Sequence, residues 1–254
     1  VFISFADRDY YVFADANGQW VWAVPGNLSL ADGKHTYSLQ VTDQAGNTSL
    51  TPFEDNFLLI TTPPSAPTIH LDEASNSGSL NDSITNVSTP TFTGSSDPYT
   101  DVIITINGKS YQIQTDENGD WQFTLDAPLA DGSYNVLVSA EDIAGNISQT
   151  DGTMTLVIDT SIPTVTGGLL EHDDSGVDHT DGITNVRTPT FHGSATPNTV
   201  VIFTINNSEY RINVGTDGLW SQRIPEALTD DTYDYSIRVE NMAGSSSTIT
   251  GSIT

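Results

Sequence analysis

The chain contains no cysteine, which excludes disulfide cross-links and thiol chemistry. This absence identifies no compartment, because oxidising surroundings permit disulfides without requiring them. Lysine and arginine are also scarce, 7 residues against 33 Asp and Glu, for a formal net charge of −26. Binding to nucleic-acid phosphates needs clustered Lys and Arg, so the composition argues against nucleic acid as a partner. An anionic membrane surface would likewise repel the chain.

Long apolar runs are missing as well. No segment approaches the ~18 apolar residues that span a bilayer, so the sequence predicts no membrane insertion. The chain begins within a strand pattern and shows no charged segment typical of a signal peptide. We therefore expect the natural protein to continue towards the N-terminus. The abundant carboxylates have two interpretations, a solvated surface or a set of cation ligands.

Internal repetition is the strongest signal in the sequence. Asp-Gln-Ala-Gly-Asn at 43–47 returns as Asp-Ile-Ala-Gly-Asn at 142–146 and as Asn-Met-Ala-Gly-Ser at 241–245, each 99 residues after the last. Thr-Pro-Thr-Phe at 89–92 recurs at 188–191 with the same step. A fixed period of this kind indicates one structural unit that is repeated along the chain.

The period predicts three units: 1–62, 63–160 and 161–254. Residues 1–20 align without gaps on 102–121, so the first unit is the C-terminal part of a repeat and lacks its first strands. A sandwich without those strands would leave its core surface bare. The other two units are complete.

Each unit reads as a set of short strands. Apolar and polar residues alternate with period two, which is typical of half-buried antiparallel strands. In the second unit the predicted inward positions are Val102, Ile104 and Ile106, then Trp121, Phe123 and Leu125, then Tyr134, Val136, Val138 and Ala140, and finally Met154, Leu156 and Ile158. Asn-Gly turns at 107–108 and 118–119 supply the positive φ of tight hairpins. The pattern predicts an all-β fold of tandem immunoglobulin-like β-sandwiches in a head-to-tail rod, with Trp20, Trp121 and Trp220 in the cores.

Short linkers join the predicted units. Both linkers, 59–67 and 158–163, contain proline, which restricts φ and favours a stiff, extended chain. A polar loop follows each linker, at 72–86 and at 171–185. Within the second loop, the segment 172–178 (His-Asp-Asp-Ser-Gly-Val-Asp) is predicted to be too polar for a core.

The topology of an immunoglobulin-like sandwich decides which loops meet at the joints. We assign 116–119 to the D–E loop, 131–132 to the E–F loop and 142–146 to the F–G loop. A head-to-tail array then places the E–F and A–B loops of one unit beside the F–G and D–E loops of the next. The residues predicted at the first joint are Asp32, Glu141 and Asp142, with Asp116 and Asn146 at the edge. Those predicted at the second joint are Asp131, Asp159 and Asn241, with Asp82 nearby.

Carboxylates and amides that converge from separate loops suit Ca²⁺, which takes six to eight oxygen ligands. Zinc is disfavoured by the absence of Cys and the scatter of five His. The alternative is that Asp and Asn only form turns here. At ~1 mM calcium and Kd values of ~0.1–1 mM, each site would add about 0.4–1.4 kcal/mol, so its main effect would be on joint stiffness. The joints differ, because Ile60 occupies the place of Asp159 and Asn241 that of Asp142.

A family resemblance covers essentially the whole chain. The motifs Thr-Pro-Thr-Phe-Thr-Gly, Asn-Gly-Asp-Trp, Leu-Ala-Asp-Gly-Ser-Tyr, Asp-Ile-Ala-Gly-Asn and Ile-Asp-Thr-Ser-Ile-Pro together resemble the bacterial Ig-like repeats of giant type I-secreted adhesins. The resemblance implies retention at the outer cell surface, Ca²⁺ at inter-repeat joints, and adhesion to host cells or abiotic surfaces in virulence or biofilm formation. The positions in this chain that match the family's joint motifs are Asp159 in the linker, Asp32 and Asp131 in Asp-Gly, and Asp43 and Asp142 in the F–G motif, so the resemblance implies a role at the joints for these residues.

No constellation of catalytic residues is visible. The pair Asp173 and Asp174 could suggest a metal ligand or a base, but neighbours on a strand point apart and nothing else recurs with them. The more serious alternative is glycan binding by a lectin-like module, for which the candidate aromatic residues are Tyr10, Tyr11, Tyr210, Tyr233 and Tyr235. Near-equivalent repeats without an aromatic insertion favour a non-catalytic, monomeric rod instead.

Overall fold

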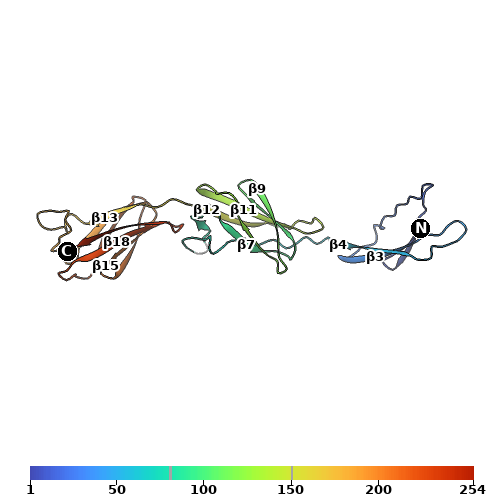
Figure 1. The fold of residues 1–254 in the computed structure, drawn as a ribbon, viewed down its shortest axis with the longest axis horizontal. Helices are drawn as coiled ribbons and strands as arrows, with labels where there is room; N and C mark the ends of the chain where they lie inside the picture. Colours follow the sequence, from blue (N-terminus) through green and yellow to red (C-terminus); the bar gives the residue numbers. More distant parts are fainter. Residues whose placement is uncertain (80–81, 150) are drawn as a thin grey trace.

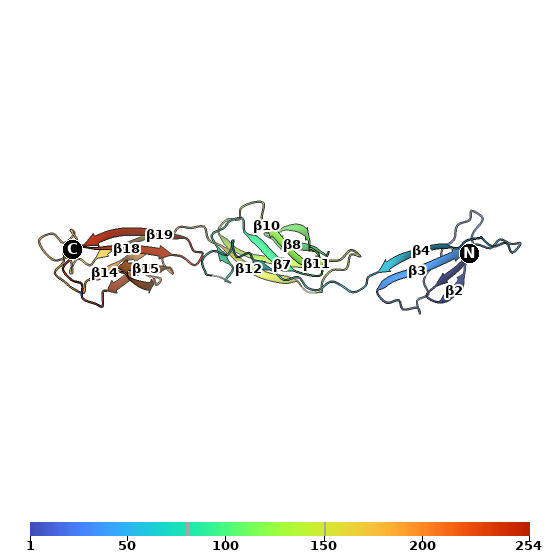
Figure 2. The same ribbon diagram turned by 60° about the horizontal axis from the view of Figure 1, so that its bottom comes forward.

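The computed structural model describes residues 1–79, 82–149 and 151–254, and within them every regular element is a β-strand. The strands form three units that follow one another along a single long axis, with the two termini at opposite ends (Figures 1 and 2). No helix in the described ranges is long and apolar enough to cross a membrane.

The first unit contains one sheet in the order β2-β1-β3-β4. Its strands are β1 (Phe2–Phe5), β2 (Arg8–Tyr11), β3 (Gly33–Gln40) and β4 (Phe53–Leu59). Residues 12–32, between β2 and β3, form no strand. Side chains from this segment and from the sheet itself cover the inner face in part, and Trp22 lies against Phe5 at 5.9 Å between ring centroids.

The second unit is a two-layer sandwich with sheets in the orders β10-β7-β5 and β6-β12-β11-β8-β9. Its strands are β5 (His70–Leu71), β6 (Ile84–Thr85), β7 (Thr91–Ser95), β8 (Asp101–Ile106), β9 (Lys109–Gln114), β10 (Asp120–Thr124), β11 (Gly132–Glu141) and β12 (Gly152–Ile158). All pairings are antiparallel except that of β6 with β12. The third unit repeats this plan, with sheets β13-β14-β17 and β16-β15-β18-β19. Its strands are β13 (Val165–Leu169), β14 (Thr190–Ala195), β15 (Val200–Ile205), β16 (Ser208–Asn213), β17 (Leu219–Arg223), β18 (Tyr233–Glu240) and β19 (Ser246–Ile253).

The predicted alternation of inward side chains is confirmed. Val102, Val136 and Leu156 are fully buried in the core of the second unit. Each complete unit has one apolar core between its sheets, centred on Phe92 in the second and Phe191 in the third. Burial of such a side chain stabilises the fold by about 1.5–3 kcal/mol. The tandem immunoglobulin-like arrangement read from the sequence is therefore the fold of the chain.

The tryptophan prediction holds in two of three units. Trp121 and Trp220 are buried in the cores, and Gly94 makes room for Trp121, because a Cβ on Gly94 would lie 2.5 Å from the indole. Trp20 is 37% exposed, so the prediction is wrong there. In the second unit Trp121 lies on β10, and Gly94 of the neighbouring strand β7 lies against its indole. The described first unit has no counterpart of β7 to cover the Trp20 ring, and apolar residues such as Phe13 also lie exposed.

A second correction concerns the polar segment 172–178. Asp173 and Asp174 are buried, although the sequence predicted that the segment is too polar for a core. A backbone N–H group contacts one oxygen of each carboxylate: the Thr190 N–H donates to Asp173 Oδ2 at 2.7 Å and the Gly182 N–H to Asp174 Oδ2 at 3.2 Å. A buried carboxylate is tolerated where such donors surround it. Asp174 Oδ1 remains without a partner in the described structure.

Candidate functional site: the joints between repeats

An aspartate of the first unit holds the linker that leads out of it. Both carboxylate oxygens of Asp32 accept hydrogen bonds, from the N–H and hydroxyl of Thr61 at 2.9 and 2.6 Å and from those of Thr62 at 3.0 and 2.6 Å. These donors stabilise the ionised carboxylate and lower the pKa of Asp32 from 3.8 to about 2. Asp32 is therefore charged at neutral pH and fixes the direction in which the chain leaves the sheet.

Asp131 performs the same role one repeat later. Its Oδ1 accepts hydrogen bonds from the Thr160 N–H at 2.9 Å and the Thr160 hydroxyl at 2.8 Å, which lower the pKa of Asp131. The next residue, Gly132, has a φ of +155°, a conformation that L side chains rarely adopt. The Asp-Gly pair thus supplies both the acceptor for the linker and the backbone that aims it.

The F–G loop of the second unit reaches back to the first linker. Asp142 Oδ1 accepts the N–H groups of Ala144 and Asn146 at 2.9 Å, which closes the loop. The Asn146 amide donates to Asp142 Oδ2 at 2.8 Å and to the backbone carbonyl of Ile60 at 3.0 Å. The pKa of Asp142 is lowered, chiefly by the hydrogen bond from the Asn146 side chain. A carboxylate therefore positions an amide, and the amide contacts the linker.

At the second joint the amide side chain belongs to Asn241, the first residue of the F–G loop, whereas at the first joint it belongs to Asn146, the last residue of that loop. Asn241 Oδ1 accepts the Ser245 N–H at 2.8 Å, as Asp142 accepts Asn146 in the earlier copy. Its Nδ2 donates to Asp159 Oδ2 at 3.1 Å and to the Ser161 carbonyl at 3.2 Å. Asn241 therefore connects the third unit directly to the linker carboxylate.

The two joints differ at two equivalent positions, one in the linker and one at the start of the F–G loop. The first joint pairs Ile60 with Asp142, and the second pairs Asp159 with Asn241, so each pair contains one carboxylate. Two carboxylates at this separation would repel each other or require a bridging cation. The departures that the sequence indicated as weakened cation sites are thus also the changes that remove like-charge repulsion.

A second contact at the second joint connects the A–B loop of the second unit, which is the polar loop at 72–86, to the F–G loop of the third unit at 241–245. The Ser77 hydroxyl donates to the Ala243 carbonyl at 2.7 Å, and the Asn86 amide donates to the Ser245 hydroxyl at 3.1 Å. The sequence placed these two loops side by side but did not identify Ser77 and Asn86 as the donors, and it also missed the threonine donors of the linkers. The available signal was the recurrence of small residues, Ser-Gly at 77–78 and 175–176 and Ala-Gly in every F–G loop.

Other predicted site residues serve their own repeat. Asp116 accepts the N–H groups of Asn118 and Asp120 at 2.8 and 2.9 Å within its turn. Asp82 Oδ1 accepts the Ile84 N–H at 3.0 Å. Glu141 lies at the end of β11, where it pairs in register with Asp101 of β8.

The joints match calcium in the kind of atoms they offer. The candidate ligands are carboxylate and carbonyl oxygens, and in the described residues none of these carboxylates forms an ion pair with Lys or Arg. Their arrangement is less favourable, because no three His, Asp or Glu side chains of the described ranges lie close enough together to hold a metal ion. At the second joint, Asp159 Oδ2 already accepts a hydrogen bond from the Asn241 amide.

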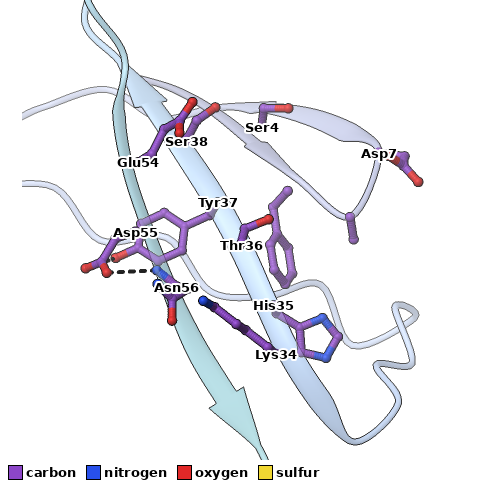
Figure 3. Close-up of a pocket in the computed structure, with 12 residues that line it drawn as sticks. Ser4, Asp7, Lys34, His35, Thr36, Tyr37, Ser38, Glu54, Asp55 and Asn56 are labelled. Carbon is purple, nitrogen blue, oxygen red and sulfur yellow. Dashed lines mark hydrogen bonds between the residues drawn. The ribbon is translucent and has the colours of Figure 1, made fainter.

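Surface hollows and aromatic residues offer no comparable arrangement. A hollow of about 680 Å³ opens on the sheet of the first unit and is lined by polar residues of β3 and β4, with the Tyr37 hydroxyl 3.3 Å from Asp55 (Figure 3). Among the candidate aromatics for glycan binding, Tyr210 and Tyr235 pack against Phe203 at centroid distances of 6.0 and 6.2 Å. Both therefore belong to the core of the third unit.

The fold and its joints define a tandem array of immunoglobulin-like sandwiches. The family model described as "Bacterial Ig-like domain" matches residues 1–54, 62–160 and 161–254, and the chain belongs to this family. A comparison with curated protein sequences finds no significant match.

Solved structures with a similar fold include parts of adhesion proteins. One is a Ca²⁺-stabilised adhesin that helps an Antarctic bacterium bind ice. It is 24% identical to this chain over 100% of this chain and 63% of that one, at a TM-score of 0.39. Another is from a 1.5-MDa bacterial ice-binding adhesin, with 24% identity over 100% of this chain and 84% of that one, at a TM-score of 0.36. A third is a tetra-tandem repeat from the extending region of a large adhesion protein, with 20% identity over 99% and 65% of the two chains and a TM-score of 0.35.

Proposed function

We propose that the chain is a non-catalytic segment of a bacterial surface adhesin, a rod of Ig-like repeats that extends or presents an adhesive surface. The observation that carries this proposal is the second joint, where consecutive sandwiches are connected by hydrogen bonds from Asn241, Ser77 and Asn86. Such contacts restrict bending between repeats. The many carboxylates add to this effect, because like charges along a rod favour its extended form.

We further propose that Ca²⁺ stiffens the joints, and the first joint more than the second. The residues that would hold the ion at the first joint are Asp142, Glu141 and Asp32, with the Ile60 carbonyl as a neutral ligand. The support is chemical: all three are carboxylates, Asp32 and Asp142 belong to hydrogen-bond networks that reach the same linker and have lowered pKa values, and none is neutralised by an ion pair in the described residues. At the second joint the Asn241 amide already bridges the two units and leaves less for a cation to contribute.

Small-angle X-ray scattering of the chain with millimolar Ca²⁺ and then with excess chelator tests this function. A longest dimension that is well defined with calcium and becomes shorter or less defined without it supports calcium-stiffened joints. Asp142→Asn should weaken the calcium response, whereas Asp126→Asn, an exposed carboxylate paired with Lys109, serves as the matched control. Identical curves in calcium and chelator would leave the rod organised by hydrogen bonds, proline and charge alone.

The remaining parts of the proposal concern the complete protein. We propose secretion by the type I route and retention at the outer cell surface, with a host cell or an abiotic surface as the target of the full-length adhesin. The motifs favour the Salmonella giant non-fimbrial adhesin, or a biofilm-associated protein of the same build, and this finer assignment stays a prediction. Core packing of Tyr210 and Tyr235 supports a rod over a lectin-like module.

A further inference from the structure

The F–G loop of the third unit fits into the A–B loop of the second as a plug into a socket. We define the plug as residues 242–245 and the socket as residues 75–78. Ala243 of the plug is 0% exposed, and its carbonyl accepts the Ser77 hydroxyl at 2.7 Å. The contact joins residues that are 166 positions apart in the sequence.

Glycines on both sides allow the two backbones to touch. Gly78 has a φ of +83°, and a Cβ built on it would lie 2.3 Å from the Met242 carbonyl oxygen. Gly244 has a φ of +79°, and a Cβ there would lie 2.6 Å from the Gly78 nitrogen. Any side chain at either position would push the loops apart, so the fit depends on glycine in both repeats.

The same plug exists at residues 143–146 of the second unit. Its loop closes with the same backbone bonds, Asp142 N–H to the Asn146 carbonyl and Gly145 N–H to the Asp142 carbonyl, both at 3.0 Å. Gly145 has a φ of +86°, close to that of its counterpart in the third unit. Yet Ile143 is 90% exposed and Ala144 is also exposed, and a Cβ on Gly145 would meet only a Glu141 oxygen at 3.9 Å. In this plug Asn146 contacts the first linker through the hydrogen bond from its amide to the Ile60 carbonyl, whereas Ile143, Ala144 and Gly145 are exposed in the described chain.

The third unit repeats the socket at residues 173–176. The Ser175 hydroxyl accepts the Asn185 N–H at 2.7 Å, as Ser77 accepts Asn86 at 2.8 Å in the second unit. Gly176 follows with a φ of +131°, and no atom lies within 4 Å of a Cβ built on it. The next residue, Val177, is fully exposed. The third unit therefore has an open counterpart of the socket, which shares the serine hydrogen bond but has a different φ at its glycine.

We propose that residues 143–146 are a docking surface for the Ser-Gly A–B loop of another complete repeat, the kind of loop that residues 75–78 and 173–176 represent. The filled joint between the second and third units supplies the geometry, and the exposed plug supplies the vacancy. Among the described residues of the first unit, whose strand β1 corresponds to β8, there is no counterpart of residues 75–78 against this surface. The proposal rests on the rod arrangement and is independent of calcium.

The test adds the missing partner to the chain. A second copy of residues 62–160 is placed before residue 62 in place of 1–61, with Asp159→Ile in the copy so that Asp142 again faces the residue found at position 60. Amide hydrogen exchange is followed in chelator for the 142–146 loop, with the 241–245 loop as the internal reference. In the unaltered chain we expect the 142–146 loop to exchange faster than the reference. In the extended chain its exchange should slow by about tenfold and approach the reference.

Gly78→Ala in the added copy is the matched control, because it blocks the new socket and leaves both natural loops intact. It should restore fast exchange at 142–146. Protection of the strands of the copy shows that it has folded. If the copy folds and exchange at 142–146 stays fast, the proposal is overturned. It is equally overturned if exchange slows and Gly78→Ala does not reverse the slowing, since the protection would then come from a contact other than the socket. Loss of calcium-dependent scattering would contradict only the calcium proposal.

Discussion

Asn241→Asp is the substitution that separates a hydrogen-bonded joint from a metal-held one. The change removes the amide donor that Asp159 Oδ2 accepts at 3.1 Å and the Ser161 carbonyl accepts at 3.2 Å. A hydrogen bond to a partly exposed group contributes about 0.5–1.5 kcal/mol. The new carboxylate also faces Asp159 at ~4 Å, where like charges repel by about 1 kcal/mol in water and about 4 kcal/mol at an effective dielectric constant of 20. Because both side chains are partly exposed, we expect a net cost of about 1–3 kcal/mol to the closed joint.

The effect should appear as faster amide exchange in the linker at 159–164, by about 5- to 150-fold in chelator. Millimolar Ca²⁺ should reverse most of it, because the variant brings together two carboxylates that a divalent cation can bridge. Asp142→Asn at the first joint is the matched comparison, since Ile60 faces it and no charge pair is created or removed. The reasoning is refuted if Asn241→Asp leaves exchange in the linker unchanged in chelator, or if calcium has the same effect on the variant and the natural chain.

Three further predictions concern single residues. A carboxyl group whose pKa is lowered in the folded state stabilises the fold at pH values above its unfolded pKa of 3.8, and this contribution is lost as the pH falls through the folded pKa. The hydrogen bonds from Thr61 and Thr62 to Asp32 should therefore persist at pH 4 and break towards pH 2. Unchanged protection of the Thr61 amide from pH 5 to pH 2 would contradict this prediction. Asp174→Asn should stabilise the chain by about 1 kcal/mol in chelator, because it neutralises a buried carboxylate that has an unpartnered oxygen. The second unit already has an amide, Asn76, at the equivalent position. A lower melting temperature of the variant would contradict this prediction. Phe191→Ala should destabilise the third unit by about 3–5 kcal/mol in urea unfolding and leave the second unit unchanged, and a loss shared by both units would show that they unfold together.

Local pattern was sufficient to predict the sandwiches. Val102, Ile104 and Ile106 alternate in the sequence because a strand places every second side chain on the same face, and all three are buried. The same reasoning failed at Trp20, whose local motif matches the other tryptophans but whose neighbouring strand, the counterpart of β7, is not present in the described first unit. It failed again at Asp173, because backbone donors that reach it from residue 190 cannot be seen in the loop sequence itself.

The joints were less predictable for a related reason. Topology placed Asp131 beside the linker, but the donors there are a threonine N–H and hydroxyl, which carry no distinctive sequence signal. Asn241 was interpreted from sequence as the loss of a charge, whereas in the structure it is an amide donor to Asp159. The change from carboxylate to amide is visible in the sequence, and its meaning depends on which residue it faces.

The most direct test of the account measures each joint separately. The chain has no cysteine, so pairs of spin labels can be introduced at exposed strand and turn positions, Lys34→Cys with Glu117→Cys across the first joint and Asn135→Cys with Thr248→Cys across the second. Double electron–electron resonance then gives the distance distribution for each pair in millimolar calcium and in excess chelator. The account predicts a narrow distribution across the second joint under both conditions, and one across the first joint that narrows when calcium is added. A second joint that broadens in chelator as much as the first would contradict the claim that hydrogen bonds and the plug hold it.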